Sequence, residues 1–250
     1  MRVLGLDVGS RTIDAVWMED GAVTDRAVLD AGFEPQEVAA RIVGRRAYDR
    51  LVATGYGRHA AAQRFGAEVI TEIGAYALGA FHLFPEARSI LDIGGQDTKV
   101  ILLSAQGRVL DFEMNDKCAA GTGRFLEVMA RALGVEVDEL GAMALNAGSA
   151  AAVSSMCTVF AESEVVGLIH RGEPRDRIAR GLHEAVARRS LAALHRARAA
   201  PPLLFAGGGA RNPALVDLIT AGMEGDVLVA PDPQLVGALG AALHALDETD

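Results

Sequence analysis

Two stretches of the chain share one pattern of hydrophobic and polar positions. Residues 3–18 read VLGLDVGSRTIDAVWM, and residues 88–103 read RSILDIGGQDTKVILL. In each stretch an apolar run leads into an Asp-x-Gly turn and a second β-rich run, and the two align without gaps so that Asp7 falls on Asp92. The pattern predicts a β-hairpin in each stretch. The matching polarity along the whole alignment favours an internal duplication over two unrelated hairpins.

Helical periodicity fills the segments between and after the hairpins. In the longest, residues 175–198, Ile178, Leu182 and Val186 repeat every four positions, which places them on one face of a helix. Asn212-Pro213 is typical of a helix cap followed by a proline in the first turn. We expect helices over residues 35–46, 58–66, 71–83, 124–133, 175–198, 213–223 and 234–246. Strands followed by helices, twice over, predict an α/β fold with two similar lobes and a cleft between them.

Composition narrows the classes of function. The formal net charge is −9 and only 5% of residues are aromatic, whereas nucleic-acid binders usually carry basic and aromatic surfaces. No uncharged apolar run reaches the length of about 18 residues that indicates a membrane span, and the N-terminus enters a strand with no room for a signal sequence. We therefore expect a cytoplasmic protein with no nucleic-acid or membrane partner. In that reducing compartment Cys118 and Cys157 need a role other than a structural disulfide.

Clusters of aspartate and glycine predict a phosphate site. The Walker pattern GxxxxGK[ST] is absent, so the chain is not a P-loop protein. Instead, DVGS begins at Asp7, DIGGQD begins at Asp92, and three glycines from Gly207 precede a predicted helix. Glycine turns let backbone N–H groups approach a phosphate chain, and an aspartate at the end of each first strand can hold magnesium through its waters. One Asp-Gly hairpin alone is usually a plain turn, but two in register favour a nucleotide site.

At these motifs the sequence resembles the superfamily of actin, the sugar kinases and the heat-shock chaperone ATPases. The resemblance implies two actin-like, ribonuclease H-like lobes with a nucleotide cleft between them. Residues 1–87 would form the first lobe, with a C-terminal helix of about 234–250 packed back on it, and residues 88–233 the second, which carries the cysteines. The residues expected to contact phosphate are Gly9, Ser10, Arg11, Thr12, Gly94 and Gly95. Those expected to border the adenosine are Gly207, Gly208, Gly209 and Asn212. Those expected to serve magnesium and the attacking water are Asp7, Asp92 and either Gln96 or Asp97.

The two cysteines are candidate metal ligands, because each stands near the expected start of a helix, where thiolate is favoured. Two cysteines cannot complete the four-thiolate shell of a 4Fe-4S cluster, but the two copies in a twofold homodimer can. By spacing alone, a role as small buried hydrophobic residues is the more frequent explanation. Zinc is a further alternative, although the close CxxC spacing of zinc ribbons is missing.

The residues around the cysteines resemble one family closely. NDKCAAGTGRFLEVMA contains Cys118 and SSMCTVFAESEV contains Cys157, and both follow LDIGGQDTKV. They are similar to the activator ATPases of 2-hydroxyacyl-CoA dehydratases and to the ATPase subunits of benzoyl-CoA reductases, from Val3 to about Leu246. The resemblance implies ATP, Mg²⁺ and one 4Fe-4S cluster held by Cys118 and Cys157 of both subunits of a homodimer. It also implies electron transfer to a partner dehydratase or reductase, and a ferredoxin- or flavodoxin-type electron donor.

One residue departs from the family pattern, because Asp14 stands where the first loop commonly carries a lysine. A carboxylate there would repel phosphate unless it were turned away or bridged by the metal, and Arg11 is a candidate for the missing positive charge. Two other functions stay open. A small-molecule kinase, such as a sugar kinase, would be colourless and keep no iron, and a filament-forming actin relative would polymerise with nucleotide. The kinase alternative leaves both cysteine motifs unexplained.

Overall fold

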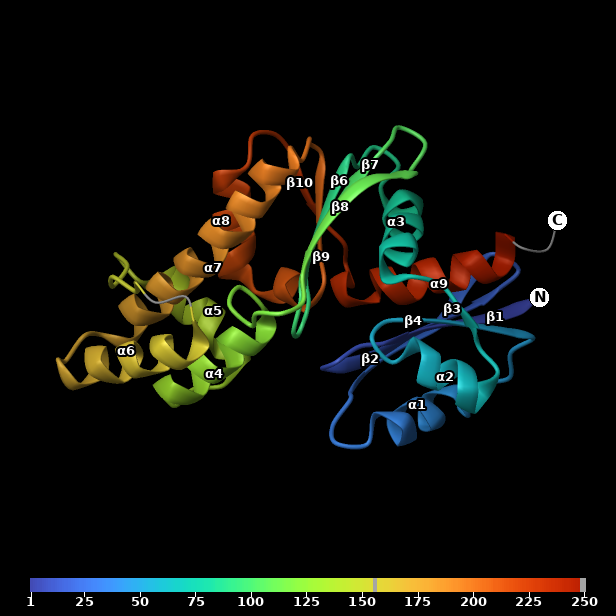
Figure 1. The fold of residues 1–250 in the computed structure, drawn as a ribbon, viewed down its shortest axis with the longest axis horizontal. Helices are drawn as coiled ribbons and strands as arrows, with labels where there is room; N and C mark the ends of the chain where they lie inside the picture. Colours follow the sequence, from blue (N-terminus) through green and yellow to red (C-terminus); the bar gives the residue numbers. More distant parts are fainter. Residues whose placement is uncertain (155–156, 248–250) are drawn as a thin grey trace. The chain divides into compact units, whose positions relative to one another are not determined.

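The computed structural model describes residues 1–154 and 157–247 (Figure 1). Within these residues the strands form two five-stranded sheets, in the orders β3-β2-β1-β4-β5 and β10-β9-β6-β7-β8. The first sheet comprises β1 (Arg2–Val8), β2 (Thr12–Glu19), β3 (Ala22–Asp30), β4 (Arg50–Thr54) and β5 (Glu68–Val69). The second comprises β6 (Ser89–Ile93), β7 (Thr98–Leu103), β8 (Val109–Asn115), β9 (Leu203–Ala206) and β10 (Val227–Val229).

The two sheets repeat one topology, because β6 to β10 take the same places in their sheet as β1 to β5 take in theirs. In the first hairpin β1 and β2 are antiparallel, and β4 joins the other side of β1 in parallel. Both hairpin turns close with the same bond: Gly9 N donates to Thr12 O, and Gly94 N donates to Asp97 O, each at 3.0 Å. The predicted hairpins and their duplication are confirmed.

The helices agree with the periodicity and add two that it did not specify. In the first half of the chain they are α1 (Pro35–Val43), α2 (Arg58–Phe65) and α3 (Glu72–Leu83). In the second half they are α4 (Gly123–Leu133), α5 (Val137–Asn146), α6 (Thr158–His170), α7 (Arg175–Ala197), α8 (Pro213–Gly222) and α9 (Val236–Asp247), with the short 3₁₀ helices η1 (Gly208–Arg211) and η2 (Pro233–Leu235). Among the helices described, none combines the length and the apolar character that crossing a bilayer requires.

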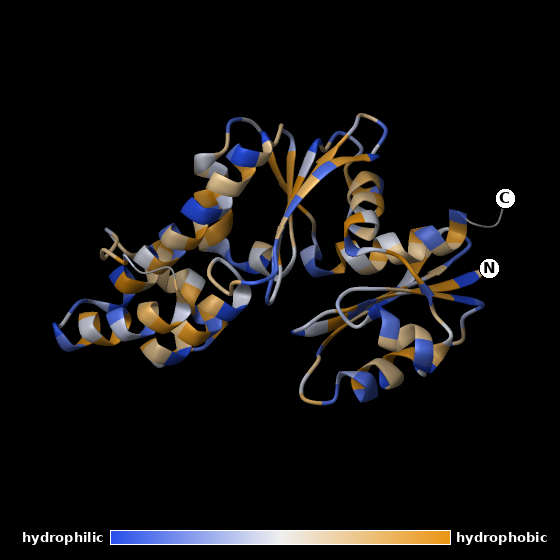
Figure 2. Ribbon diagram, viewed as in Figure 1, coloured by the Kyte–Doolittle hydropathy of each residue, from blue (hydrophilic) through white to orange (hydrophobic). Residues whose placement is uncertain are grey.

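The chain forms two compact units. The first comprises Met1–Ile90, Ile101–Asp111 and the segment that starts at Ala230, and the second comprises Leu91–Val100 and Phe112–Val229. In the first unit both faces of the sheet are buried. Alternate residues of β1, β2 and β4 face α1 and α2, and the residues between them face α9, as the twofold alternation of a strand requires. Figure 2 shows α3 and α9 to be hydrophobic over most of their lengths, consistent with helices that are covered on several sides.

The second unit differs from the first by an insertion of helices. Helices α4 to α7 stand between β8 and β9, where the first unit has only α1 between β3 and β4. Helix α7 buries Ile178, Leu182 and Val186, the face that their spacing predicted. Helix α5 carries a capping box, in which the side chains of Glu136 and Glu139 each accept the other residue's backbone N–H; this pattern stabilises a helix start.

Candidate nucleotide and cluster sites

In the first unit, Asp7 lies near the end of β1 directly opposite Asp14 on β2, so the two side chains share one face of the sheet. Only 7% of Asp7 and 6% of Asp14 is exposed. Glycine backbones stand against the Asp7 carboxylate: a Cβ on Gly55 would lie 2.3 Å from Oδ1, and a Cβ on Gly237 would lie 2.4 Å from Oδ2. The cradle around Asp7 therefore exists only because both positions are glycine.

The turn after Asp7 runs from Gly9 to Thr12. Ser10 is exposed, and Arg11 Nη1 lies 2.7 Å from Asp30 Oδ2 in an ion pair whose side chains are both about half exposed. Thr12 Oγ1 donates to Asp14 Oδ2 at 3.1 Å. The Arg11 guanidinium is thus paired with Asp30, and the Asp14 carboxylate is directed in part to Thr12.

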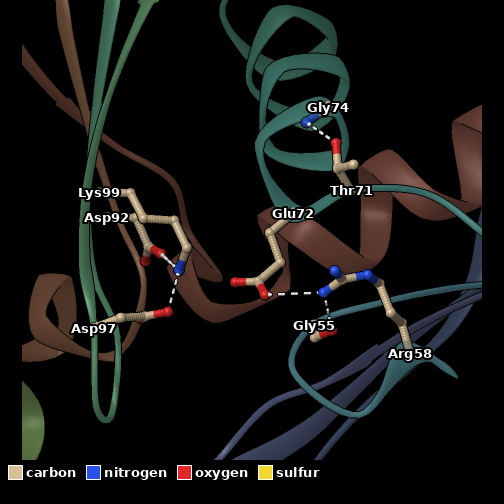
Figure 3. Close-up of polar contacts among 8 residues, drawn as sticks. All are labelled: Gly55, Arg58, Thr71, Glu72, Gly74, Asp92, Asp97 and Lys99. Atoms are coloured by element: carbon tan, nitrogen blue, oxygen red, sulfur yellow. Dashed lines mark hydrogen bonds and ion pairs between the residues drawn. The ribbon is translucent and has the colours of Figure 1, made fainter. Parts of the chain in front are cut away.

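In the second unit, Asp92 occupies the equivalent place at the end of β6 and is buried. The buried Lys99 ammonium lies 3.0 Å from Asp92 Oδ2 and 2.8 Å from Asp97 Oδ2 (Figure 3). Gln96, at the tip of this turn, is exposed. A cation in this place offsets the cost of burying the Asp92 carboxylate. Asp92, which the sequence suggested as a magnesium residue, thus has an ammonium partner from its own hairpin.

The glycines from 207 to 209 follow β9 and lead through η1 to α8. Gly207 has φ +77°, and a Cβ there would lie 2.1 Å from Asp92 Oδ1, so this glycine approaches Asp92 as Gly55 approaches Asp7. Asn212 caps α8, because its Oδ1 accepts from Ala214 N at 3.1 Å and from Leu215 N at 3.2 Å. The predicted cap and helix are confirmed.

Both cysteines are free and exposed, which contradicts the alternative that they are small buried hydrophobic residues. Cys157 is the N-cap of α6, and the neighbouring Val159 and Phe160 side chains are 68% and 67% exposed. Ser155 and Met156, which precede Cys157 in its motif, lie outside the described residues. Cys118 lies in the loop from β8 to α4, where Asn115 Nδ2 donates to the Cys118 carbonyl oxygen at 3.0 Å.

Hydrogen bonds join the phosphate-loop candidate of the second unit to the segment that carries Cys118. The first N–H groups of α4 donate to that loop: Gly123 N to Gly94 O at 2.9 Å and Arg124 N to Gly95 O at 2.8 Å. Thr98 Oγ1 donates to Gly121 O at 3.1 Å. The loop and the start of α4 are therefore joined directly through the backbone, next to the Cys118 segment.

The model of the BadF/BadG/BcrA/BcrD ATPase family matches residues 4–245. The chain belongs to this family. It is 43% identical to the activator of lactoyl-CoA dehydratase of Anaerotignum propionicum, over 99% of this chain and 98% of that protein. Its structure superposes on the activator of the 2-hydroxyisocaproyl-CoA dehydratase from Clostridium difficile, solved with bound ADPNP, with a TM-score of 0.92, 39% identity and coverage of 99% and 95% of the two chains.

The actin-like fold class is likewise confirmed. The ROK hexokinase from Thermus thermophilus aligns over 100% of both chains with a TM-score of 0.53 and 21% identity, a likeness that establishes a shared fold and no more. Membership of the ATPase family agrees with the resemblance found at the cysteine motifs. The likeness to the hexokinase supports a shared fold but gives no support to the alternative that this chain is a kinase.

Two features of this BadF/BadG/BcrA/BcrD family member were missed from the sequence. Gly55 and Gly57 are the counterparts of Gly207 and Gly209: a Cβ on Gly57 would lie 2.5 Å from Val8 Cγ1, and one on Gly209 would lie 2.6 Å from Ile93 Cβ. The signal was the GYG at residues 55–57, directly after the short apolar run that starts at Leu51. Figure 3 shows Arg58, the next residue, donating to Gly55 O at 2.9 Å beside its ion pair with Glu72.

His183 is the second missed residue. Its Nδ1 lies 2.7 Å from Ala179 O, and because a carbonyl only accepts, Nδ1 carries the proton. Nε2 therefore accepts from Asn212 Nδ2 at 2.9 Å. Burial lowers the pKa of His183 and keeps the ring neutral. A lone histidine on a long helix gave no sequence signal, yet it fixes the orientation of Asn212.

Proposed function

We propose that the chain is an activator that couples ATP hydrolysis to one-electron transfer from a 4Fe-4S cluster to a partner metalloenzyme, a 2-hydroxyacyl-CoA dehydratase. The observation that carries the proposal is the pair of hydrogen bonds from α4 to Gly94 and Gly95, next to the segment with Cys118. Family membership and the full-length similarity to dehydratase activators support it.

For the nucleotide, we infer that the phosphates contact the Gly9–Thr12 turn (Gly9, Ser10, Arg11 and Thr12) and the turn with Gly94 and Gly95. We infer that Gly207, Gly208 and Gly209 border the adenosine beside Asn212. Two observations support these inferences. Glycine at both turns leaves the backbone open to phosphate, and glycines approach Asp7 and Asp92 in the same way. These halves, residues 1–87 with the C-terminal helix and residues 88–233, are our inferred actin-like lobes.

For the metal and water, Asp7 is our candidate magnesium residue, because it lies beside the Gly9–Thr12 turn and opposite a second buried carboxylate, Asp14. Bound magnesium would neutralise charge on the phosphates. Asp92, our second candidate for magnesium, shares the Lys99 ammonium with Asp97. Either the exposed Gln96 or Asp97 is the candidate that orients the attacking water. Within residues 1–154 and 157–247, no group of three or more histidine, cysteine or acidic residues is placed to hold a metal alone, so waters and phosphates would complete the shell.

For the cluster, Cys118 and Cys157 are the proposed ligands, two from each subunit of a homodimer. Both thiols are exposed, and the α6 N-terminus at Cys157 favours an anionic ligand. The exposed Val159 and Phe160 beside Cys157 supply apolar area that a second subunit would cover. A bound cluster would accept one electron from a ferredoxin- or flavodoxin-type donor and release it to the partner enzyme.

The coupling that we propose runs through the backbone of the second unit. Nucleotide contacts at Gly94 and Gly95 would shift their carbonyl groups, and the bonds to Gly123 and Arg124 would carry the shift into α4. Such a change affects electron transfer only if the two nucleotide states hold the cysteine segment differently. The expected consequence is that the reduction potential or the docking of the partner depends on the bound nucleotide.

The test is oxygen-free purification followed by iron and sulfide analysis, with about four of each expected per two chains. Cys118→Ala should lose the iron while it still binds an ATP analogue, and Ser154→Ala, close to Cys157, should keep the iron. Electron transfer to a purified dehydratase and to an aromatic-ring reductase would identify the acceptor class. Retained iron or full electron transfer in Cys118→Ala would refute the assignment, and a colourless wild type that phosphorylates a hydroxyl compound would favour the kinase.

A further inference from the structure

A cavity of about 190 Å³ lies in the second unit between β7, β8 and α7. Its polar lining residues are Thr98, Glu113, Asn115, Arg189, Ser190 and Arg196. Thr98 and Val100 alternate with Lys99 along β7 and therefore face the other side of the strand. The cavity is thus separated by β7 from the Lys99 ammonium and its two carboxylates, and it is distinct from the phosphate-loop candidate.

The cavity contains donors that the chain itself does not satisfy. Ser190 is only 2% exposed, and its Oγ has no hydrogen-bond partner among the described residues, an arrangement that costs free energy unless a ligand or water fills it. Arg189 packs its stem against Gly121, where a Cβ would lie 2.9 Å from Arg189 Cδ. Within the described part of the chain, its guanidinium makes no hydrogen bond or ion pair. The buried Ser190 hydroxyl therefore needs a partner, and the exposed Arg189 guanidinium places a positive charge beside it.

The charge of the lining identifies the sign of the ligand. Arg196 is paired with Glu113, so Arg189 is the lining cation without an ion-pair partner among the residues that the structure describes. The remaining wall is apolar and consists of Val100, Gly121, Ala192 and Ala193. A void of about 150 Å³ accommodates a benzene ring, so this cavity has room for a small organic ion.

We propose that this cavity binds a small carboxylate with a short hydrocarbon chain. The carboxylate accepts from Ser190 Oγ and from the Arg189 guanidinium, and the hydrocarbon contacts Val100 and the two alanines. Two lining residues also hold the Cys118 loop, because Thr98 donates to Gly121 O and Asn115 donates to Cys118 O. Occupation of the cavity therefore restrains residues 115–121. Binding itself does not depend on the proposed electron-transfer function.

The experiment is calorimetric titration of the full chain with butanoate, acetate, inorganic phosphate and 1-butanol. We expect one butanoate per chain, acetate binding about tenfold weaker because it lacks two methylene groups, and no saturable binding of 1-butanol. Arg189→Gln should raise the dissociation constant for butanoate at least about tenfold, and Ser190→Ala several-fold. Arg188→Gln is the matched control, because Arg188 adjoins Arg189 on α7 but pairs with Glu184 outside the cavity; its dissociation constant should not change.

Hydrogen exchange followed by mass spectrometry locates the ligand independently, because saturating butanoate should slow exchange in residues 115–121 of the wild type and not of Arg189→Gln. Failure of the wild type to bind butanoate saturably would overturn the proposal, as would equal affinity in Arg188→Gln and Arg189→Gln. Phosphate binding as tight as butanoate binding would overturn the role of the apolar wall. Thermal unfolding of each variant shows whether it is folded, and the iron content reports separately on the proposed function.

Discussion

The two hairpins have the same backbone and opposite charge at one position. In the first, Asp7 lies opposite Asp14, and in the second, Asp92 is bonded to Lys99, the residue that aligns with Asp14. The turns close with identical hydrogen bonds, and Gly55 and Gly207 approach the two first-strand aspartates in the same way. The fold therefore fixes the aspartate and the glycine beside it, but it does not fix the charge of the residue across the strand.

This difference makes the two halves chemically unequal. Lys99 neutralises Asp92 and Asp97 from within the second hairpin, whereas the first hairpin places a second buried carboxylate beside Asp7. Two carboxylates on adjacent strands repel each other unless a cation or a proton is shared between them. The duplicated hairpin thus carries a lysine beside one first-strand aspartate and a second carboxylate beside the other.

Among the variants that test this difference between the hairpins, Lys99→Met should cause the largest loss of stability. It leaves the buried Asp92 carboxylate without its ammonium, and removal of one partner from a buried pair costs about 3–5 kcal/mol of unfolding free energy. Urea unfolding measures the loss. Arg11→Met is the matched control, since it breaks a half-exposed pair with Asp30 and should cost about 1 kcal/mol or less. Equal losses in the two variants would show that the Lys99 pair contributes no more than a surface pair.

Gly55→Ala and Gly207→Ala should each cost about 2–4 kcal/mol, because an L-residue at positive φ is strained and its Cβ would overlap an aspartate oxygen. The similarity of the two losses is the prediction that concerns the duplication. Gly66→Ala has a similar φ of +69° with nothing within 4 Å of the added Cβ, and should cost about 1 kcal/mol. Chemical unfolding gives the stability of the three variants. A large loss of stability in only one of Gly55→Ala and Gly207→Ala would show that the surroundings of Asp7 and Asp92 differ.

Asp14→Lys should give the first hairpin the charge pattern of the second. If the Gly9–Thr12 turn binds phosphate, the change from a negative to a positive side chain should tighten binding of a non-hydrolysable ATP analogue with magnesium by about 1 kcal/mol, or roughly fivefold. Asp14→Asn should lie between the wild type and Asp14→Lys. Calorimetry gives the three dissociation constants, and identical values would show that Asp14 does not lie close enough to the phosphate site to affect binding.

His183, which lies in the second unit, should make the free energy of unfolding depend on pH. Its pKa is lowered in the folded chain by burial, so below about pH 6.5 the unfolded chain takes up a proton that the folded chain refuses. As the pH is lowered, this group should therefore reduce the free energy of unfolding by at most about 1.4 kcal/mol per pH unit. His183→Gln should flatten this part of the profile between pH 7 and 5.5, measured by urea unfolding, whereas the exposed His59→Gln should not.

Much of the fold was readable because its determinants are local. The apolar run at residues 3–8 predicted the first strand, and apolar residues at every fourth position from 178 to 186 predicted helix α7. Asn212-Pro213 predicted the start of α8. Helix α5 was missed because its capping glutamates at 136 and 139 do not include the more usual serine or threonine. His183 was missed because its partner Asn212 is close only after α7 and α8 have packed.

The sequence by itself determined the duplicated hairpins, most of the helices, the glycine turns and the two cysteine motifs, because each depends on residues within a few positions of one another. Only the tertiary structure decided that Gly55 and Gly207 press against the two aspartates, that Lys99 bridges Asp92 and Asp97, and that α4 is bonded to the turn at Gly94 and Gly95. The physical reason is that burial and hydrogen bonding depend on distances through space. Those distances are set when strands and helices from separate parts of the chain pack together.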